Sequence, residues 1–215
     1  MLQAKQTELI KYCEAHSSPH SQLLYELERE TYLKTLAPQM LSGQLQGRIL
    51  SMISQLKQPQ MILEIGTFTG YATLCLAEGL TKDGQIITIE ANPEVAYFIK
   101  KYKEKANLAE QIIHITGRAE AVIPTLNHTF DLAFIDAGKK DYPHHFDLVI
   151  DRMNPGGIIL ADNVLWSGKV LLETSKQDAD TQLLDAFNKK IQADHRVENV
   201  LLPIRDGLTV MRKKA

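Results

Sequence analysis

Short apolar segments alternate with longer amphipathic segments from Met61 to the C-terminus, and this alternation constrains the fold more than any other feature. The apolar segments are rich in isoleucine and span about five residues, the usual length of a buried strand. Strands of this kind that alternate with helices are typical of a parallel sheet covered on both faces. We therefore expect an α/β fold built on a mostly parallel sheet.

The expected elements follow from this periodicity and from the turn residues between the segments. Strands are predicted at residues 61–65, 85–90, 111–115, 130–135 and 157–161, and helices at 71–79, 93–105, 120–126, 142–152 and 178–194. The turn Pro155-Gly156-Gly157 is expected to introduce the fifth strand. Segments 197–202 and 208–212 have no helix between them, which predicts a closing antiparallel hairpin.

The region before Met61 predicts helices at 2–15, 21–36 and 43–56, with turn residues between them. We find no internal repeat and no linker of biased composition in the sequence. We therefore expect a single domain over residues 1–215, in which 1–57 form a helical extension and 58–215 form the α/β core.

Composition restricts the class of protein. The chain is 44% hydrophobic and 23% charged with a net charge of −2, so it lacks the basic excess typical of nucleic-acid binders, and we expect no such partner. Two cysteines, Cys13 and Cys75, are too few for a disulfide scaffold, and we expect both to be reduced. Neither a signal peptide nor an apolar run of about 20 residues is found, so we expect a cytoplasmic protein without membrane contact.

A glycine-containing turn after the first predicted strand indicates a ligand site. In Glu64-Ile65-Gly66-Thr67-Phe68-Thr69-Gly70, the glycines allow close approach of the backbone, and the next helix offers free N–H groups. The spacing differs from the G-x-G-x-x-G of dinucleotide folds. Glu90 ends the second strand, where a carboxylate can accept hydrogen bonds from ribose hydroxyls. These features favour an adenosine-containing ligand, with an ordinary βα turn and a solvated carboxylate as the alternatives.

Hard oxygen donors follow the fourth and fifth predicted strands. Asp136 comes after one strand, and Asp162 and Asn163 come after the next. Carboxyl ends of parallel strands meet at one edge of the sheet, and carboxylate and amide oxygens suit Mg²⁺. Lys139 lies three residues after Asp136, so it can reach the same place and take a proton from a substrate hydroxyl.

Simpler interpretations of these residues exist. Aspartates after strands often cap the next helix, Asp-Asn pairs are common in turns, and Lys139 could be a surface lysine. The histidines show no spacing typical of zinc ligands. The neighbours His144 and His145 would point to different faces of a helix, so we expect that pair to be structural or solvated.

Three segments of the chain closely resemble the caffeoyl-CoA and catechol O-methyltransferase family of class I S-adenosylmethionine-dependent enzymes. These segments are LEIGTFTGYATLCLA (63–77), FDLAFIDAGKKDY (130–142) and LADNVLWSGKV (160–170). The segments MLSGQLQGRIL (40–50) and LPIRDGLTVMRKK (202–214) are also similar to its pattern. The resemblance implies a Rossmann-like seven-stranded sheet in which only the last strand is antiparallel, helices on both faces, extra N-terminal helices and a homodimer.

The resemblance also implies a role for individual residues. Asp136, Asp162 and Asn163 would bind Mg²⁺, or Mn²⁺ or Ca²⁺ in its place. Lys139 would be the catalytic base and, with Trp166, would contact the substrate. S-adenosylmethionine would contact Met40, Ser42, Glu64, Gly66, Thr67, Phe68, Ala72, Glu90, Ala119 and Asp136. Within this set, Glu90 would bind the ribose and Ala119 would lie beside the adenine.

The sequence departs from the family pattern at three positions. Ala72 stands where a serine is usual, so one hydrogen bond to the donor would be missing. Thr209 stands where catechol enzymes carry an acid, and Pro38 replaces an aromatic residue at the mouth of the site. These departures affect which substrate is expected more than which type of reaction is expected.

We therefore predict a metal-dependent O-methyltransferase that transfers the methyl group of S-adenosylmethionine to a hydroxyl of a catechol-like or caffeoyl-type small molecule. A methyltransferase of a hydroxylated tRNA nucleoside is the first alternative, and a non-catalytic protein that binds the same donor is the second. An NAD-dependent oxidoreductase is disfavoured by the glycine spacing.

Overall fold

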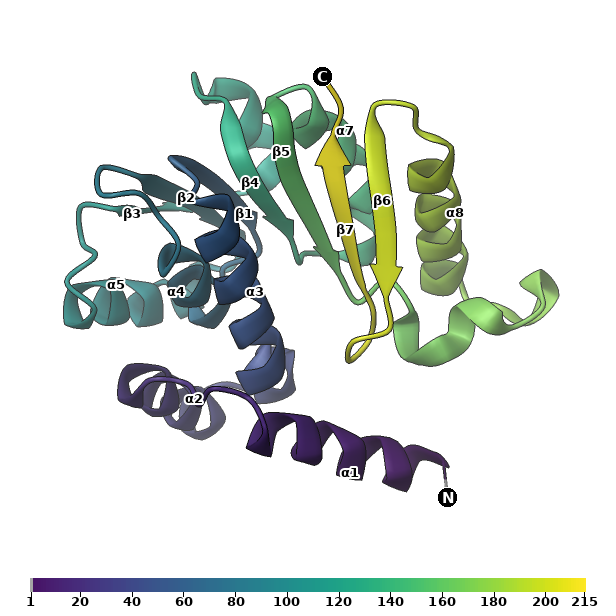
Figure 1. Ribbon diagram of the computed structural model, residues 1–215, viewed down its shortest axis with the longest axis horizontal. Helices are drawn as coiled ribbons and strands as arrows, with labels where there is room; N and C mark the ends of the chain where they lie inside the picture. The colour runs from purple at the N-terminus through teal and green to yellow at the C-terminus, as the bar shows by residue number, and fades with distance from the viewer. Residues whose placement is uncertain (1) are drawn as a thin grey trace.

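The computed structural model describes the backbone of residues 2–215 and the side chains from Glu8 onward. A twisted seven-stranded sheet in the order β3-β2-β1-β4-β5-β7-β6 runs through the molecule (Figure 1). The strands are β1 Met61–Ile65, β2 Gln85–Glu90, β3 Ile112–Thr116, β4 Phe130–Ile135, β5 Met153–Asp162, β6 Val197–Leu202 and β7 Leu208–Lys213. Strand β7 is antiparallel to β5 and β6, whereas the other neighbouring pairs are parallel. The predicted Rossmann-like fold is confirmed.

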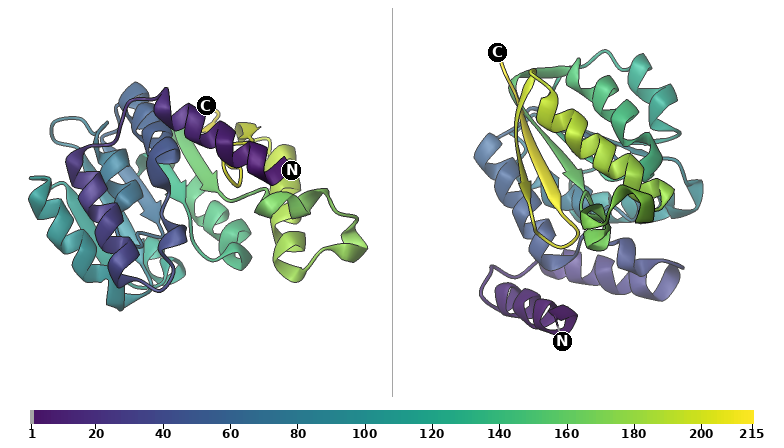
Figure 2. Two further views of the ribbon diagram at one scale, coloured as in Figure 1. Left: turned by 90° about the horizontal axis from the view of Figure 1, so that it is seen from below. Right: turned by 90° about the vertical axis from the view of Figure 1, so that its right-hand side faces the viewer.

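Helices cover both faces of this sheet. The α-helices are α1 Leu2–Ala15, α2 Gln22–Lys34, α3 Gly43–Lys57, α4 Tyr71–Ala77, α5 Ala96–Lys105, α6 Ala119–Val122, α7 Tyr142–Ile150 and α8 Ala179–Ala193. The 3-10 helices are η1 Pro38–Met40, η2 Pro93–Val95, η3 Ile123–Thr125, η4 Lys139–Asp141, η5 Trp166–Leu171 and η6 Thr174–Lys176. Helix α2 packs against α4 and α5, and α1 packs against α3. Two views show α1 outside the layers that cover the sheet (Figure 2).

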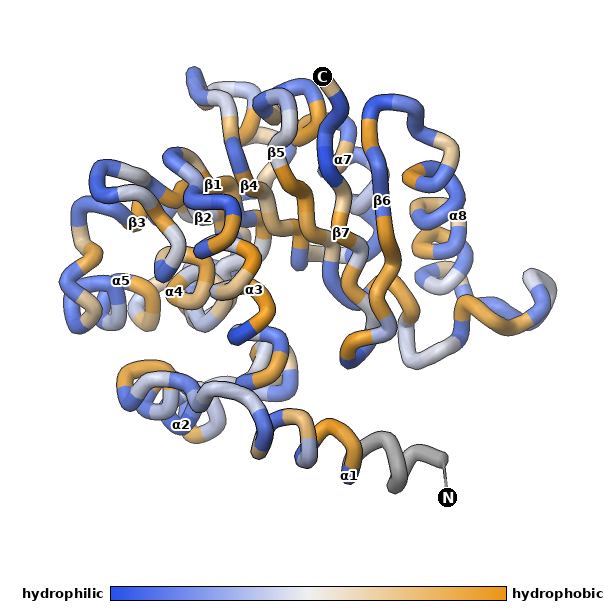
Figure 3. The backbone as a smooth tube through the Cα atoms, in the orientation of Figure 1, coloured by the Kyte–Doolittle hydropathy of each residue, from blue (hydrophilic) through white to orange (hydrophobic). Residues whose placement is uncertain are grey.

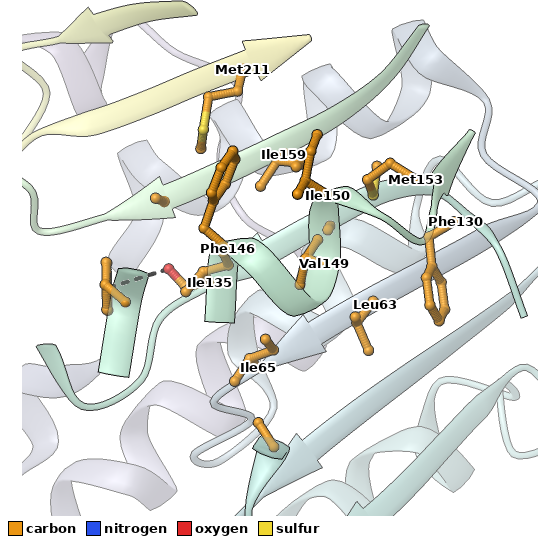
Figure 4. Close-up of a cluster of buried hydrophobic side chains, with 14 of the residues drawn as sticks. Leu63, Ile65, Phe130, Ile135, Phe146, Val149, Ile150, Met153, Ile159 and Met211 are labelled. Atoms are coloured by element: carbon orange, nitrogen blue, oxygen red, sulfur yellow. Dashed lines mark hydrogen bonds between the residues drawn. The ribbon is translucent and has the colours of Figure 1, made fainter. Parts of the chain in front are cut away.

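Two apolar cores lie on opposite faces of the sheet because successive side chains of a strand alternate in direction. Leu63 and Ile65 of β1 pack with residues of α6, α7 and α8, whereas Ile62 packs with residues of α3, α4 and α5. Figure 4 shows the first core, where Phe146 projects from α7 toward the strands. Helix α8 alternates between apolar and polar residues along its length (Figure 3), as a helix with one buried face must.

Strand β5 differs from the prediction. It begins at Met153, four residues before the predicted start, so the turn Pro155-Gly156-Gly157 lies inside it rather than before it. The pairing explains this result, because Met153 is paired with Phe130 but Ile158 is already paired with Leu132. The strand therefore bulges between its two paired parts, and Gly156 accommodates the bulge with φ of +73°.

Two of the predicted helices are each divided into an α-helix and a 3-10 helix that contains a proline. The segment 93–105 begins as the 3-10 helix η2 at Pro93, and 120–126 changes from α6 to η3 around Pro124. Pro93 stands at the first helical position, where proline is tolerated because no N–H is needed there, so it marks the start of the helix. Pro124 lacks the N–H that an α-helical hydrogen bond requires, which accounts for the change from α6 to η3. The remaining predicted helices end within two residues of the observed ends.

Two further expectations concern the described part of the chain. Cys13 and Cys75 are both free thiols, as predicted. No helix over residues 2–215 has the length and apolar character needed to cross a membrane.

Candidate active site

A cavity of about 1050 Å³ lies at the carboxyl ends of strands β1, β2, β4 and β5. Gly66 follows β1 and Asp136 follows β4, while Glu90 ends β2 and Asp162 ends β5, and all four line the cavity. Met40 of the N-terminal region also lines the cavity. The cavity therefore occupies the place where open α/β sheets bind their ligands.

Most of the predicted site residues line this cavity. They are Met40, Gly66, Phe68, Glu90, Ala119, Asp136, Lys139, Asp162, Asn163 and Trp166. Four predicted donor-binding residues lie buried outside its lining: Ser42, Glu64, Thr67 and Ala72. The side chains of Thr67 and Glu64 are turned toward Thr88 of β2, which holds them away from the cavity.

The structure brings the predicted metal ligands and the predicted base together. Nζ of Lys139 lies 2.8 Å from Oδ1 of Asn163 and 3.3 Å from Oδ1 of Asp136. It also lies 2.8 Å from the hydroxyl oxygen of Tyr142, which is fully buried at the start of α7. The lysine therefore sits between side chains from the ends of β4 and β5, where the cavity can present a ligand to it.

The carboxylate of Asp162 is held on both sides. Its Oδ2 accepts a hydrogen bond of 2.6 Å from Nε2 of Gln46, and its Oδ1 accepts one of 2.7 Å from the backbone N–H of Asn163. Asp162 is only 2% exposed. Asn163 has φ of +55°, a left-handed backbone that asparagine tolerates better than most residues. Both side chains are thus fixed at the end of β5.

These donors suit a divalent cation. Burial and the nearby charge of Asp162 raise the pKa of Asp136 to about 6. A dication between the two carboxylates would favour their ionised forms, and each carboxylate oxygen keeps lone pairs beyond those in the hydrogen bonds. Two carboxylates and an amide oxygen form a hard donor set that fits Mg²⁺.

Gly66 allows the turn after β1 to pack closely against the end of β4. Its φ is +99°, and a Cβ placed on it would lie 1.9 Å from the carbonyl oxygen of Asp136. No larger residue fits, because the obstacle is backbone. The glycine therefore brings the β1 turn and the Asp136 strand end into one wall of the cavity.

Glu90 is fixed by backbone N–H groups. Its Oε2 accepts from Phe68 and its Oε1 accepts from Asn92, each at 2.8 Å. Phe68 itself has φ of +49°, so the turn after β1 bends to reach this carboxylate. Each oxygen retains a lone pair beyond these hydrogen bonds, and Glu90 lines the cavity, so it is suited to accept hydrogen bonds from a diol.

Glu64 lies beneath the turn in a polar network. Thr73 and Thr88 donate hydrogen bonds to its Oε2, and Thr67 in turn donates to Thr88. Its Oε1 is buried and has no hydrogen-bond partner in the described part of the chain, and burial raises the pKa of Glu64 to about 8. At neutral pH this carboxyl group is therefore mostly protonated, which reduces the cost of burying it.

Comparison with known proteins identifies the protein family to which this chain is similar. The family model described as O-methyltransferase matches residues 14–214. Catechol O-methyltransferase of Niastella koreensis is 38% identical over 161 residues, which cover 73% of this chain and 72% of that protein. Caffeoyl-CoA O-methyltransferase of Populus kitakamiensis is 32% identical over 178 residues, 78% of this chain and 76% of the relative.

The chain belongs to the O-methyltransferase family. Among solved structures, the SAH-bound methyltransferase PaMTH1 of Podospora anserina superposes with a TM-score of 0.90 at 29% identity, covering 99% of this chain and 96% of that one. The O-methyltransferase of Bacillus cereus in complex with SAH gives a TM-score of 0.87, also at 29% identity, covering 95% and 96%. The predicted class of enzyme, an S-adenosylmethionine-dependent O-methyltransferase, is confirmed.

Several residues of this O-methyltransferase that line or support the cavity were not predicted. Tyr142 supports Lys139, Gln46 supports Asp162, and Arg205 and Asp206 line the cavity from the turn between β6 and β7. The segment 202–214 was noted for its hairpin turn and for its similarity to the family pattern, but turn chemistry alone explains Arg205 and Asp206, so neither was assigned to the site.

A second polar group was also missed. Glu120, Asp141 and His145 line the same cavity, and their potential ligand atoms all lie within 4.8 Å of one another. His145 is 3% exposed, and neither ring nitrogen has a hydrogen-bond partner among the described residues. Burial lowers its pKa, so the ring is neutral at neutral pH. The spacing of four residues between Asp141 and His145 was the signal that could have found this group.

The mouth of the cavity carries apolar residues. Trp166, predicted to contact the substrate, lines the cavity and also packs against the core on the α7 side. Trp166, Ser167 and Gly168 have φ between +48° and +75°, which forms a sharp turn after β5. Thr209 is buried in β7 outside the lining of the cavity.

Proposed function

We propose that this O-methyltransferase is metal-dependent and methylates one hydroxyl of a catechol-like or caffeoyl-type small molecule. The observation that carries the proposal is the position of Lys139, whose Nζ lies within 3.3 Å of oxygens from both Asp136 and Asn163. A general base beside a set of cation ligands is the arrangement that deprotonation of a chelating diol requires. The names of the catechol and caffeoyl-CoA relatives support the same class of acceptor.

The wall formed by the β1 turn is proposed to bind the donor. Glu90 would accept hydrogen bonds from the ribose, and the backbone around Gly66 would approach the methionine part, since no side chain obstructs it there. Ala119 lies at the start of α6 and lines the far end of the cavity, where we place the adenine. The wall would be supported from the protein interior by four buried residues, Ser42, Glu64, Thr67 and Ala72.

The proton path follows from the hydrogen bonds of Lys139. The hydroxyl of Tyr142 donates to the backbone carbonyl of Asp162 at 2.8 Å, so its oxygen accepts from Lys139. This contact aims the amine at the cavity, and Lys139 in its neutral form would take the proton of the acceptor hydroxyl. Asp136, Asp162 and Asn163 would hold Mg²⁺, or Mn²⁺ or Ca²⁺ in its place, which would stabilise negative charge on the acceptor oxygen.

Apolar groups at the mouth support an aromatic acceptor. Trp166, Met40 and Leu36 line the cavity, and Leu36 and Met40 are largely exposed, so an aromatic ring could cover them. Thr209 offers no carboxylate to a second hydroxyl, which leaves that hydroxyl to the cation site. We therefore expect the two vicinal hydroxyls to be recognised together.

The decisive experiment is a methyl-transfer screen with purified full-length protein and labelled S-adenosylmethionine. Catechols, hydroxycinnamoyl esters, flavonoids and tRNA would be compared, each with Mg²⁺ and after treatment with EDTA. We expect transfer to vicinal dihydroxy aromatics, no transfer to their monohydroxy analogues, and loss of activity on chelation that Mg²⁺ restores.

Two results would contradict the proposal. Transfer to tRNA without transfer to small catechols would favour the tRNA alternative, and activity that is indifferent to EDTA would remove the cation. Asp162→Asn tests the ligand assignment directly, because it should weaken Mn²⁺ binding. Asp185→Asn is the matched control, since Asp185 pairs with Lys189 of the same helix and does not line the cavity.

Three broader expectations are also retained as proposals. Residues 1–215 would act as one domain with the extension at 1–57, and the protein would be cytoplasmic and dimeric. Exposed Tyr12, Tyr32 and Leu33 on the N-terminal helices support a surface that a second copy could cover.

A further inference from the structure

Gln46 and Arg205 connect the carboxylate of Asp162 to the chain segment before helix α3. Nε2 of Gln46 donates to Oδ2 of Asp162 at 2.6 Å, and Oε1 of Gln46 accepts from Arg205 at 3.0 Å. Arg205 also donates to the carbonyl oxygens of Leu41, at 3.0 Å, and Ser42. Gln46 is 1% exposed, so water does not compete for these bonds.

The orientation of the Gln46 amide is set by its two neighbours. A guanidinium only donates hydrogen bonds and a carboxylate only accepts them. The amide oxygen must therefore face Arg205 and the amide nitrogen must face Asp162. A flipped amide would place donors against donors and acceptors against acceptors, so the restraint on Asp162 depends on Arg205 as well.

Arg205 occupies a backbone conformation that an arginine does not favour. Its φ is +49°, in the left-handed region where glycine has no steric penalty. Gly207 in the same turn has φ of +92°, so the turn needs this geometry. The contacts of the Arg205 side chain with Gln46 and with the Leu41 and Ser42 carbonyls offset the strain, which points to a role for that side chain.

We propose that Gln46 and Arg205 are positioning residues that couple binding of the methyl donor to binding of the metal ion. The inference rests on the proposed function, because it takes Asp162 as a metal ligand. Met40, which directly precedes the Leu41–Ser42 segment, lines the cavity. A bound donor fixes the position of the Leu41–Ser42 segment, and this segment fixes the Arg205 side chain through its carbonyl oxygens. Through Gln46, Arg205 then fixes the position of the Asp162 carboxylate.

The reverse effect follows from linkage. If the donor raises the affinity for the cation by way of Asp162, the cation must raise the affinity for the donor by the same factor. Asp162 keeps its bond from the Asn163 backbone without Gln46, but Oδ2 then loses its protein partner. Loss of a partner behind a metal ligand typically weakens metal affinity by about 10–100-fold.

Calorimetric titration of the full-length protein tests this coupling. S-adenosylhomocysteine, the donor without its methyl group, is titrated with and without saturating Mn²⁺, and Mn²⁺ is titrated alone. In the natural protein we expect Mn²⁺ to tighten S-adenosylhomocysteine binding by about tenfold. In Gln46→Leu we expect Mn²⁺ binding about 10–100-fold weaker, and no remaining effect of one ligand on the other.

Steady-state kinetics provide a second test of the role of Gln46. Gln46→Leu should raise the Mg²⁺ concentration for half-maximal activity far more than it lowers kcat at saturating Mg²⁺, which a general loss of folding would not do. Gln44→Leu is the matched control. It makes the same change two residues away, where Nε2 of Gln44 donates to the carbonyl of Glu14 and, among the described residues, to nothing else, and it should behave as the natural protein does.

The outcomes separate this inference from the proposed function. A natural protein that binds no Mn²⁺ would overturn both, whereas Mn²⁺ binding with unchanged coupling in Gln46→Leu would overturn the inference alone. If Gln46→Leu does not fold, Arg205→Lys carries the test, because one ammonium cannot replace the guanidinium bonds to Gln46, Leu41 and Ser42 together. Full coupling in Arg205→Lys would then contradict the inference.

Discussion

Lys139 donates a hydrogen bond of 2.8 Å to the side-chain oxygen of Asn163, although 24 residues separate them in the chain. The bond joins the loop after β4 to the end of β5 and places an amine among the proposed cation ligands. Its neighbour Lys140 is exposed and does not line the cavity, so only one of the two lysines can serve this site.

Lys139→Ala should lower turnover by about 10²–10⁴-fold, the usual contribution of a general base. Binding of S-adenosylhomocysteine should change little, because the proposed donor wall lies on the β1 and β2 side. Steady-state kinetics and calorimetry measure the two effects. Lys140→Ala is the control and should retain full activity. Near-normal turnover in Lys139→Ala would remove the assigned base.

Glu90→Gln should weaken binding of S-adenosylhomocysteine by about 1.5–3 kcal/mol, the contribution of hydrogen bonds to a charged group. In the natural protein the Glu90 carboxylate accepts hydrogen bonds from the backbone N–H groups of Phe68 and Asn92. The amide of glutamine would turn its NH₂ donor toward one of these N–H groups, so one of the two hydrogen bonds would also be lost. Calorimetry checks this result, with the exposed Glu104→Gln as the control. Equal affinity in the two variants would rule out contact between Glu90 and the donor.

Gly66→Ala should destabilise the protein by about 3 kcal/mol or more, because its Cβ would collide with the backbone of Asp136. Gly156→Ala separates the collision from the backbone strain, since Gly156 has φ of +73° but nothing within 4 Å of a Cβ. That control should cost only about 1–2 kcal/mol. Urea denaturation measures both, and similar losses would mean that the β1 turn can move away.

Glu64 should make the protein less stable as the pH rises. Its pKa is raised to about 8 in the folded protein from an ordinary 4.5, so the native state holds the proton more tightly than the unfolded chain does. The stability that this proton contributes is complete below about pH 4.5 and is lost as the pH rises through 8. Glu64→Gln should therefore lose less stability than the natural protein between pH 6 and pH 8.

Urea denaturation at several pH values measures this effect. The exposed Glu110→Gln provides the reference, because it removes a carboxylate without changing the interior. Parallel stability profiles for the natural protein and Glu64→Gln would show that Glu64 does not titrate in this range.

Much of the fold could be predicted because strand and helix periodicities are local. The strands 61–65, 85–90, 130–135 and 197–202 were predicted with the observed bounds. The start of β5 was not, because the bulge around Gly156 exists only through the pairing of β5 with β4. Pro155-Gly156-Gly157 has turn residues, and the neighbouring strand decides that the sheet continues through them.

The chain order of Asp136, Lys139, Asp162 and Asn163 determined by itself that hard oxygen donors and an amine would follow two consecutive strands. Their assembly into one wall was an expectation that only the packed sheet could test. The supports of that wall, Gln46 and Arg205, lie in two segments that resemble the family pattern, but nothing local to either segment predicts its contact with Asp162 or with the other. Their bonds to Asp162 and to the Leu41–Ser42 segment span more than 100 residues, and such contacts exist only once the chain has folded.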